Sequence, residues 1–296
     1  MFRFQCEQQT FEIGKIRFGG QPGKRRTVMV GSLFYPRHSL VEDRRSGRVD
    51  TAACEKVITN LHKASEETSC PAGLMIYAET KEAMSSYLER VAELTDLPLF
   101  IDSPIAEVRL SGAIRAGEMG IGSRVVYNTL SAGSTAEELG GLRDSGIEAA
   151  VLLAFNPRDL ATKGKIYMLE DGGGLLESGL IDLAKTYGVK KPLLDMAVMA
   201  AEQNAGAALR ALFVAKAKWG YPSGCALHNA VESWPPTLKL QGDDRKLFRY
   251  IDVASAIMPV MVGADFVIYG PVEYARRVFH AAAFADEMMF EASGDL

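Results

Sequence analysis

Short apolar runs alternate along most of the chain with longer stretches in which apolar residues recur at helical spacing. The runs that predict strands cover residues 27–35, 74–78, 98–102, 125–127, 149–155, 192–194, 225–227 and 265–269. The stretches that predict helices cover residues 50–64, 81–94, 104–119, 175–187, 200–219, 245–262 and 272–290, and one more helix begins after Thr135. Eight consecutive strand–helix pairs, joined by short connections, predict an α/β fold: a (β/α)8 TIM barrel made by a single domain over residues 1–296.

The amino-terminal residues have a different pattern. Residues 10–18 consist of two short strand-like runs around Gly14 and Lys15, which predicts a β-hairpin with a glycine-first turn. We expect this hairpin to close the amino-terminal end of the barrel, opposite the end that carries active sites. No G-x-G-x-x-G motif follows the first strand, so the sequence disfavours a dinucleotide-binding domain.

Polar side chains follow four of the predicted strands. Asp102 ends the third strand, Asn128 the fourth and Asp195 the sixth, and Asn229 follows the seventh. The carboxyl ends of the strands meet at one end of such a barrel, where its active sites lie. Two carboxylates and two amides there predict a pocket for a flat heterocycle with several N–H and C=O groups. Glu79 ends the second strand and is a fifth candidate, although each residue alone is also typical of a turn or a helix cap.

The composition limits the classes of partner. With 48% hydrophobic and 24% charged residues, the chain can bury a full core, and its formal net charge of -4 disfavours nucleic acid as a partner. No apolar run approaches the ~20 residues of a membrane helix, and the first residues lack the core of a signal peptide. We therefore expect a cytoplasmic protein without membrane insertion. The cysteines and histidines form no C-x-x-C or H-E-x-x-H motif, so no protein-held metal is expected.

The opening of the chain resembles a known family. Residues 16–23, IRFGGQPG, and residues 27–35, TVMVGSLFY, are similar to the H subunit of tetrahydromethanopterin S-methyltransferase and its soluble relatives in corrinoid-dependent methylotrophy. The likeness extends through nearly the whole chain. The strand ends at Asp102 and Asn229 are more distantly similar to methyltetrahydrofolate:corrinoid methyltransferases and to the pterin-binding barrels of the dihydropteroate synthase type.

This resemblance implies a methyltransferase that moves a methyl group between a methylcorrinoid (cobalamin) and N5 of a tetrahydropterin. Tetrahydrofolate is the preferred pterin and tetrahydromethanopterin the alternative, a separate carrier protein would bring the corrinoid, and a homodimer is expected. Carried over residue by residue, Asp102, Asn128 and Asp195 would bind the pyrimidine edge of the pterin. Asn229 would lie near N5, and Asn229 and Asp195 are the predicted catalytic residues. His228 stands where the family would have a small residue.

The chemistry of these side chains agrees with that role. A carboxylate can accept two charge-assisted hydrogen bonds from the N–H groups of a pterin edge, which fixes the orientation of the ring. Methyl transfer needs near-linear alignment, so positioning supplies much of the rate. Asn229 can donate a hydrogen bond to N5, but a neutral amide is not a general acid.

Two other functions stay open at this point. A dihydropteroate synthase-like or phosphosugar enzyme would need a Lys or Arg at a strand end to bind phosphate, and none of the predicted strand ends carries one. A noncatalytic component of a larger methyl-transfer complex would bind the pterin but act only together with other subunits.

Overall fold

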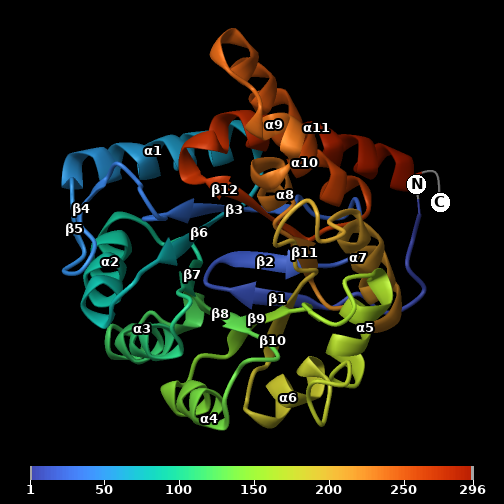
Figure 1. The fold of residues 1–296 in the computed structure, drawn as a ribbon, viewed down its shortest axis with the longest axis horizontal. Helices are drawn as coiled ribbons and strands as arrows, with labels where there is room; N and C mark the ends of the chain where they lie inside the picture. Colours follow the sequence, from blue (N-terminus) through green and yellow to red (C-terminus); the bar gives the residue numbers. More distant parts are fainter. Residues whose placement is uncertain (1, 295–296) are drawn as a thin grey trace.

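The computed structural model describes residues 2–294, in which eight parallel strands close into a barrel surrounded by helices (Figure 1). The barrel strands are β3 (Val28–Leu33), β6 (Ala72–Tyr77), β7 (Leu99–Asp102), β8 (Val125–Leu130), β9 (Ala149–Leu153), β10 (Lys191–Asp195), β11 (Ser223–Cys225) and β12 (Phe266–Pro271). The main helices are α1 (Thr51–Thr68), α2 (Lys81–Leu94), α3 (Ala106–Glu118), α4 (Ala136–Ser145), α5 (Thr162–Glu170), α6 (Leu180–Thr186), α7 (Gly206–Trp219), α10 (Arg245–Met261) and α11 (Ala275–Gly294). The predicted TIM barrel is therefore confirmed.

Alternation along the strands sorts the apolar side chains into two sets. One set packs inside the barrel and includes Val30, Phe100, Val126 and Leu193. The other faces the surrounding helices and forms the larger core cluster, as Ile101 does one residue after Phe100. Because side chains point to opposite faces in turn, the residue two positions beyond each interior apolar residue also faces the barrel axis.

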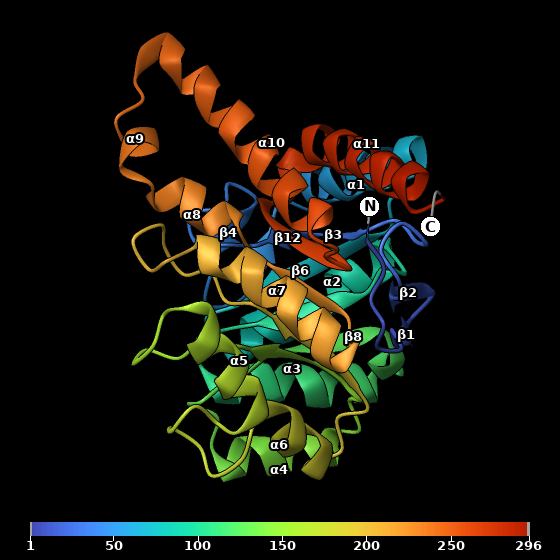
Figure 2. The same ribbon diagram turned by 90° about the vertical axis from the view of Figure 1, so that its right-hand side faces the viewer.

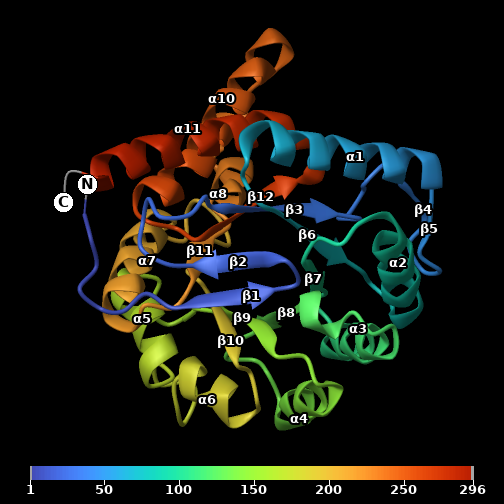
Figure 3. The ribbon, with the colours of Figure 1, turned by 180° about the vertical axis from the view of Figure 1, so that it is seen from behind.

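The amino-terminal hairpin closes one end of the barrel, as expected. It is formed by β1 (Thr10–Ile13) and β2 (Ile16–Gly19), which pair antiparallel, and Figure 3 shows it lying across the end of the barrel. Phe18 is fully buried there, with its ring centroid 6.2 Å from Phe100 and 6.4 Å from Phe266. This apolar plug leaves the carboxyl end of the strands as the accessible end.

Helix boundaries follow local signals where those signals are strong. The second predicted helix and α2 share the same bounds, Lys81–Leu94, and the Thr80 hydroxyl accepts a hydrogen bond from the Ala83 N–H. Thr135 caps α4 as predicted, by accepting from the Glu138 N–H. Gly146 ends α4 with a φ of 74°, a left-handed conformation that favours glycine.

Two helical predictions need correction. The helix expected over residues 175–187 begins only at Leu180, and α5 lies ahead of it, in the segment after the fifth strand where no helix was predicted. The helix expected over residues 200–219 begins at Gly206, because the Ala-rich residues before it form turns in which Asn204 has a φ of 55°. Propensity alone favours helix across those residues, whereas the loop path after β10 does not permit it.

Two additions to the barrel matter for its surface. A small hairpin of β4 (Val41–Asp43) and β5 (Arg48–Val49) follows β3. After β11 come α8 (His228–Ser233) and α9 (Pro235–Leu238), and Figure 2 shows them, with the first part of α10, projecting from the barrel on the side opposite the β1–β2 hairpin. We refer to residues 228–250 as the arm. Within residues 2–294, no helix combines the length and the apolar character needed to cross a membrane.

Candidate active site

Two of the predicted residues meet directly at the carboxyl end of the barrel. Asp102 and Asn128 are paired Cα partners on the neighbouring strands β7 and β8. The Asn128 amide Nδ2 donates to Asp102 Oδ1 at 3.0 Å. Both side chains follow interior apolar residues, Phe100 and Val126, so they face the barrel axis. The β7–β8 pairing is regular as far as these two residues, whereas the β8–β9 register shifts between Tyr127 and Leu130.

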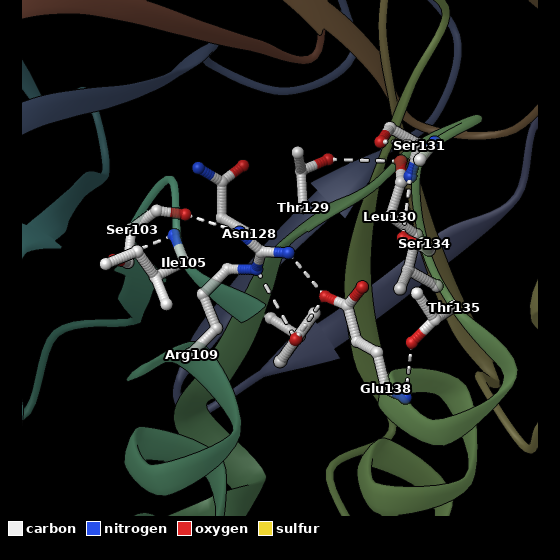
Figure 4. Close-up of polar contacts among 12 residues, drawn as sticks. Ser103, Ile105, Arg109, Asn128, Thr129, Leu130, Ser131, Ser134, Thr135 and Glu138 are labelled. Atoms are coloured by element: carbon white, nitrogen blue, oxygen red, sulfur yellow. Dashed lines mark hydrogen bonds and ion pairs between the residues drawn. The ribbon is translucent and has the colours of Figure 1, made fainter. Parts of the chain in front are cut away.

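A charged network behind this pair fixes the loop that follows Asp102. Arg109 of α3 donates to the carbonyl oxygen of Ser103 and forms an ion pair with Glu138 of α4 (Figure 4). The Tyr127 hydroxyl donates to Glu138 Oε1 at 2.5 Å. Glu138 is 2% exposed, and a buried carboxylate is stable only when it is paired in this way. The network ties α3 and α4 to the ends of β7 and β8.

Asp195 is the second carboxylate at this end. It ends β10, two residues after the interior residue Leu193, and is 6% exposed. Among the described residues its Oδ1 atom has no hydrogen-bond partner. Burial raises the pKa of Asp195 to about 7, although the nearby Lys165 ammonium opposes the rise. A buried carboxylate with an open acceptor is costly in an empty site, so it is well suited to a ligand that brings an N–H donor.

The environment of Asp102 perturbs this carboxyl in the same direction. Burial raises its pKa to about 6, while the hydrogen bond from Asn128 and the charge of Arg109 act against the rise. Both carboxyl groups thus have pKa values close to neutral pH. Perturbed groups of this kind concentrate at functional sites.

Two predicted residues have other partners in the structure. Asn229 lies in the first turn of α8, and its Nδ2 donates to the Val198 carbonyl oxygen at 2.8 Å, in the loop that follows Asp195. Glu79 lies two residues beyond the end of β6 and forms an exposed ion pair with Arg44 at 3.4 Å. The structure therefore brings Asp102 and Asn128 together, turns Asp195 inward and places Asn229 beside the Asp195 loop. A pterin-binding role for each stays a prediction.

The helix that carries Asn229 is held by a second charged network. His228 Nδ1 lies 2.6 Å from Asp252 Oδ1 of α10, and Arg277 Nε of α11 donates to Asp252 Oδ2 at 3.0 Å. The Glu232 carboxylate lies 3.1 Å from Nε2 of the same histidine. Burial alone would lower the pKa of His228, but the bonds to Asp252 and Glu232 outweigh it and raise the pKa to about 9. His228 is therefore an imidazolium at neutral pH. It binds α8 to α10 directly and, through Asp252, to Arg277 of α11.

Sequence reasoning missed two residues at this end. Tyr77 is the Cα partner of Asp102 on β6, two residues after the interior residue Met75. Alternation along that strand could have found it. Lys165 carries no comparable signal, because it lies on α5, in the insertion between β9 and β10. Within residues 2–294, no three His, Cys, Asp or Glu side chains are grouped as ligands of one metal ion.

This geometry can hold a flat ring by its polar edge. Two carboxylate acceptors and an amide line the end of a barrel whose interior is apolar below them. Ionised carboxylates accept paired N–H donors strongly, and the apolar residues beneath exclude water from those bonds.

Comparison with known proteins decides the family. Residues 6–296 match the family model described as the tetrahydromethanopterin S-methyltransferase MtrH subunit. The chain belongs to the MtrH family. It is 39% identical over 296 residues to the H subunit of tetrahydromethanopterin S-methyltransferase of Methanothermobacter marburgensis, covering all of this chain and 96% of that protein. It is 38% identical to the H subunit of the putative methyltransferase mtx of Methanosarcina mazei, with the same coverage. The resemblance inferred from the sequence is confirmed, and this MtrH-family chain is a methyltransferase.

Solved structures support the fold. The dihydropteroate synthase of Yersinia pestis, in complex with a pterine-sulfa conjugate, has a TM-score of 0.63 to this MtrH-family chain at 14% identity and covers 97% of this chain and 99% of its own. The enzyme of Thermus thermophilus has a TM-score of 0.60 at 18% identity and covers 94% and 98%. At these identities the likeness establishes the shared barrel alone.

Proposed function

We propose that this protein moves a methyl group between a methylcorrinoid held by a carrier protein and N5 of a tetrahydropterin, within a single domain over residues 1–296. The observation that carries the proposal is the inward-facing Asp102–Asn128 pair, joined by Asp195 with its open acceptor. A pterin presents adjacent N–H donors along its pyrimidine edge, which ionised carboxylates of this kind accept. Family membership supports the reaction class.

The residues would act mainly by positioning. The N5 lone pair attacks the methyl carbon, the carbon–cobalt bond breaks with its electron pair passing to cobalt, and the N5 proton passes to solvent. Holding the ring by its far edge aligns N5 with the methyl group, and alignment supplies much of the rate. The β1–β2 hairpin closes the opposite end, so the carrier must approach the carboxyl end of the barrel.

The choice of pterin is open to direct test. The sequence favours tetrahydrofolate, whereas the names of the relatives specify tetrahydromethanopterin for those proteins. We propose tetrahydromethanopterin as the first substrate to test, because the names of the relatives specify it. Tetrahydrofolate is the second, because both compounds share the pyrimidine edge that the site would bind. Titrating each pterin into the purified protein measures the preference. Incubating the preferred one with methylcobalamin should produce N5-methylpterin, and no product with either pterin, with or without a carrier, contradicts the proposed reaction.

Asn229 is expected to act on turnover more than on binding. Its amide lies at the start of α8, beside the Asp195 loop, where it can turn toward N5. Replacing Asn229 by Ala should lower kcat by about tenfold or more through loss of a donor that acts in the transition state, with a smaller change in pterin Kd. The exposed Asn60→Ala variant on α1 is the control. A larger effect on Kd than on kcat would contradict this role.

Two names among the relatives denote a subunit, which favours a second candidate: a component that acts only within a larger complex. Purified protein that binds pterin yet turns over only when mixed with other subunits would support it.

We also propose a cytoplasmic location, which fractionation of cells that express the protein would test.

We propose further that the protein forms a homodimer through the arm. A groove of about 610 Å³ between α7 and α10 is lined almost entirely by apolar residues, including Leu209 and Trp234. Tyr250 is 72% exposed beside it. On α10 the apolar residues Leu247, Ile251, Ala254 and Met258 recur at heptad spacing, which is typical of a helix that packs on another helix. The groove and the arm lie side by side on the surface of one protomer. In a dimer with a twofold axis, the arm of each protomer would therefore lie over the groove of the other.

A further inference from the structure

A buried cation lies next to the buried carboxylate Asp195 and comes from a helix. Lys165 of α5 is 2% exposed, and its Nζ atom donates to the Ala197 carbonyl oxygen at 2.7 Å. The N–H of Ala197 donates in turn to the Asp195 carboxylate. The backbone of one residue thus links the two charges, with its amide on the anion and its carbonyl on the cation.

Neither charged group is saturated by these contacts. Within residues 2–294, Oδ1 of Asp195 has no hydrogen-bond partner. An ammonium has three N–H donors, and the bond to Ala197 uses one of them. Burying a carboxylate without full compensation costs free energy, and an opposite charge nearby reduces that cost. Lys165 supplies that charge while leaving the open acceptor of Asp195 uncovered.

The link between the two residues is conformationally unusual. Ala197 has a φ of 27°, in the left-handed region that residues with a Cβ rarely occupy. Such conformations persist when the surrounding contacts over-determine them, and they cluster at functional sites. Here the two hydrogen bonds to Lys165 and Asp195 hold the peptide groups on either side of the strained Cα.

We propose that Lys165 is a positioning residue of the pterin site, which keeps Asp195 ionised and fixes its loop so that Oδ1 can accept an N–H of the pyrimidine edge. This inference rests on the proposed function. The alternative is that Lys165 merely anchors the loop after β10 to α5, in which case its loss would not change how binding depends on pH.

The charged and titratable groups that act on Asp195 come from two neighbouring elements. Burial lowers the pKa of Lys165, and Asp195 acts against that fall. On β11, burial and then the charge of Asp195 raise the pKa of the Cys225 thiol, which therefore stays neutral at pH 7. Lys165 is thus the cation that opposes protonation of Asp195. Without it, Asp195 would bind its proton up to a higher pH.

Calorimetric titration of pterin from pH 6 to 9 tests this role. In Lys165→Met the pH midpoint below which pterin affinity is lost should move up by about one pH unit, so that affinity at pH 7 drops about fivefold while the loss at pH 9 is small. Lys163→Met, an exposed position on the same helix, should leave the profile unchanged. An unchanged midpoint in Lys165→Met, or an equal loss at every pH, would overturn the inference. Wild-type protein that binds no pterin at any pH would instead overturn the proposed function.

A measurement on the protein without pterin distinguishes failure of this inference from failure of the proposed function. The shift in urea midpoint caused by Lys165→Met at pH 8 should be large in the wild-type background and much smaller in Asp195→Asn, because the neutral amide no longer needs the cation. Equal shifts in both backgrounds would mean that Lys165 only anchors the loop, and the inference would be wrong whether or not pterin binds.

Discussion

At the scale of single residues, the carboxyl end of the barrel keeps groups that the empty protein would be more stable without. Burial raises the pKa of Asp102 to about 6 and that of Asp195 to about 7. Each rise means that ionising the group costs more in the folded chain than in the unfolded chain. A bound donor would remove that cost, so the same feature that destabilises the empty site favours ligand binding.

Asp195→Asn should therefore separate stability from binding. The folded-state pKa of Asp195 lies above its ordinary value, so its contribution to stability is most favourable below pH 4 and is lost as the pH rises through about 7. The stability of the Asn variant relative to wild type should therefore rise between pH 5 and pH 8, by on the order of 2 kcal/mol, because the neutral amide does not pay for ionisation. Its pterin affinity should fall by roughly 2–4 kcal/mol. Urea unfolding and calorimetry measure the two effects, and a stability difference from wild type that stays the same between pH 5 and pH 8 would contradict the assignment.

At the scale of elements, the helix that carries Asn229 depends on charges from two other helices. His228 of α8, Asp252 of α10 and Arg277 of α11 meet in one buried cluster, and Arg277 also lies over the Tyr274 ring at 3.5 Å. Gly270 of β12 approaches this cluster so closely that a Cβ there would stand 2.3 Å from the His228 ring. A glycine is therefore required at the end of β12 for the imidazole to fit.

Because of this cluster, the free energy of unfolding should fall as the pH becomes alkaline. The folded-state pKa of His228 is raised to about 9, so its contribution is fully present below pH 6.5 and is lost as the pH rises through about 9. Asp252→Asn should cost about 3–5 kcal/mol at pH 7, because it leaves the buried His228 imidazolium and the partly exposed Arg277 guanidinium without the carboxylate that they share, and should remove most of the loss seen between pH 7 and 10. Glu232→Gln, at a half-exposed position, is the matched control with a smaller cost. Urea unfolding at both pH values tests this, and equal costs for the two variants would contradict it.

At the scale of the whole molecule, one end of the barrel is closed and the other carries both the site and the arm. The β1–β2 hairpin fills the amino-terminal end with Phe18, while α8, α9 and the start of α10 extend past the carboxyl end (Figure 2). The proposed carrier and the proposed second copy would therefore occupy neighbouring surfaces. The proposed pterin site lies inside the barrel, and the apolar groove lies outside it, between α7 and α10.

Tyr250→Asp tests the proposed dimer. Tyr250 is 72% exposed beside the groove, so the change should leave the folded protomer intact but place an unpaired charge in an apolar interface. Light scattering after size exclusion should give a dimer for wild type and a monomer for the variant, with pterin affinity within about threefold of wild type. Phe284→Asp, at an exposed apolar position on α11, is the control. A dimeric Tyr250→Asp protein would place the interface elsewhere.

The sequence by itself determined the eight barrel strands and their order, the amino-terminal hairpin and the direction of three candidate site residues. These follow from local rules: two-residue alternation turns Asp102, Asn128 and Asp195 inward once the strands close into a barrel, and Thr135 caps its helix through its own hydroxyl. Local propensity failed where the chain path overrides it, in the turns before Gly206 and in the insertion that contains α5.

Only the tertiary structure decided which side chains act on those inward-facing groups. Lys165 is thirty positions before Asp195 and on a helix, and Asp252 reaches His228 from another helix, so no spacing in the sequence relates them. Alternation fixes the face on which a side chain lies, but its charged neighbours depend on how helices pack around the closed barrel. The sequence therefore predicted the end of the barrel on which the candidate side chains lie, while packing set their pKa values and left the acceptor of Asp195 open to a ligand.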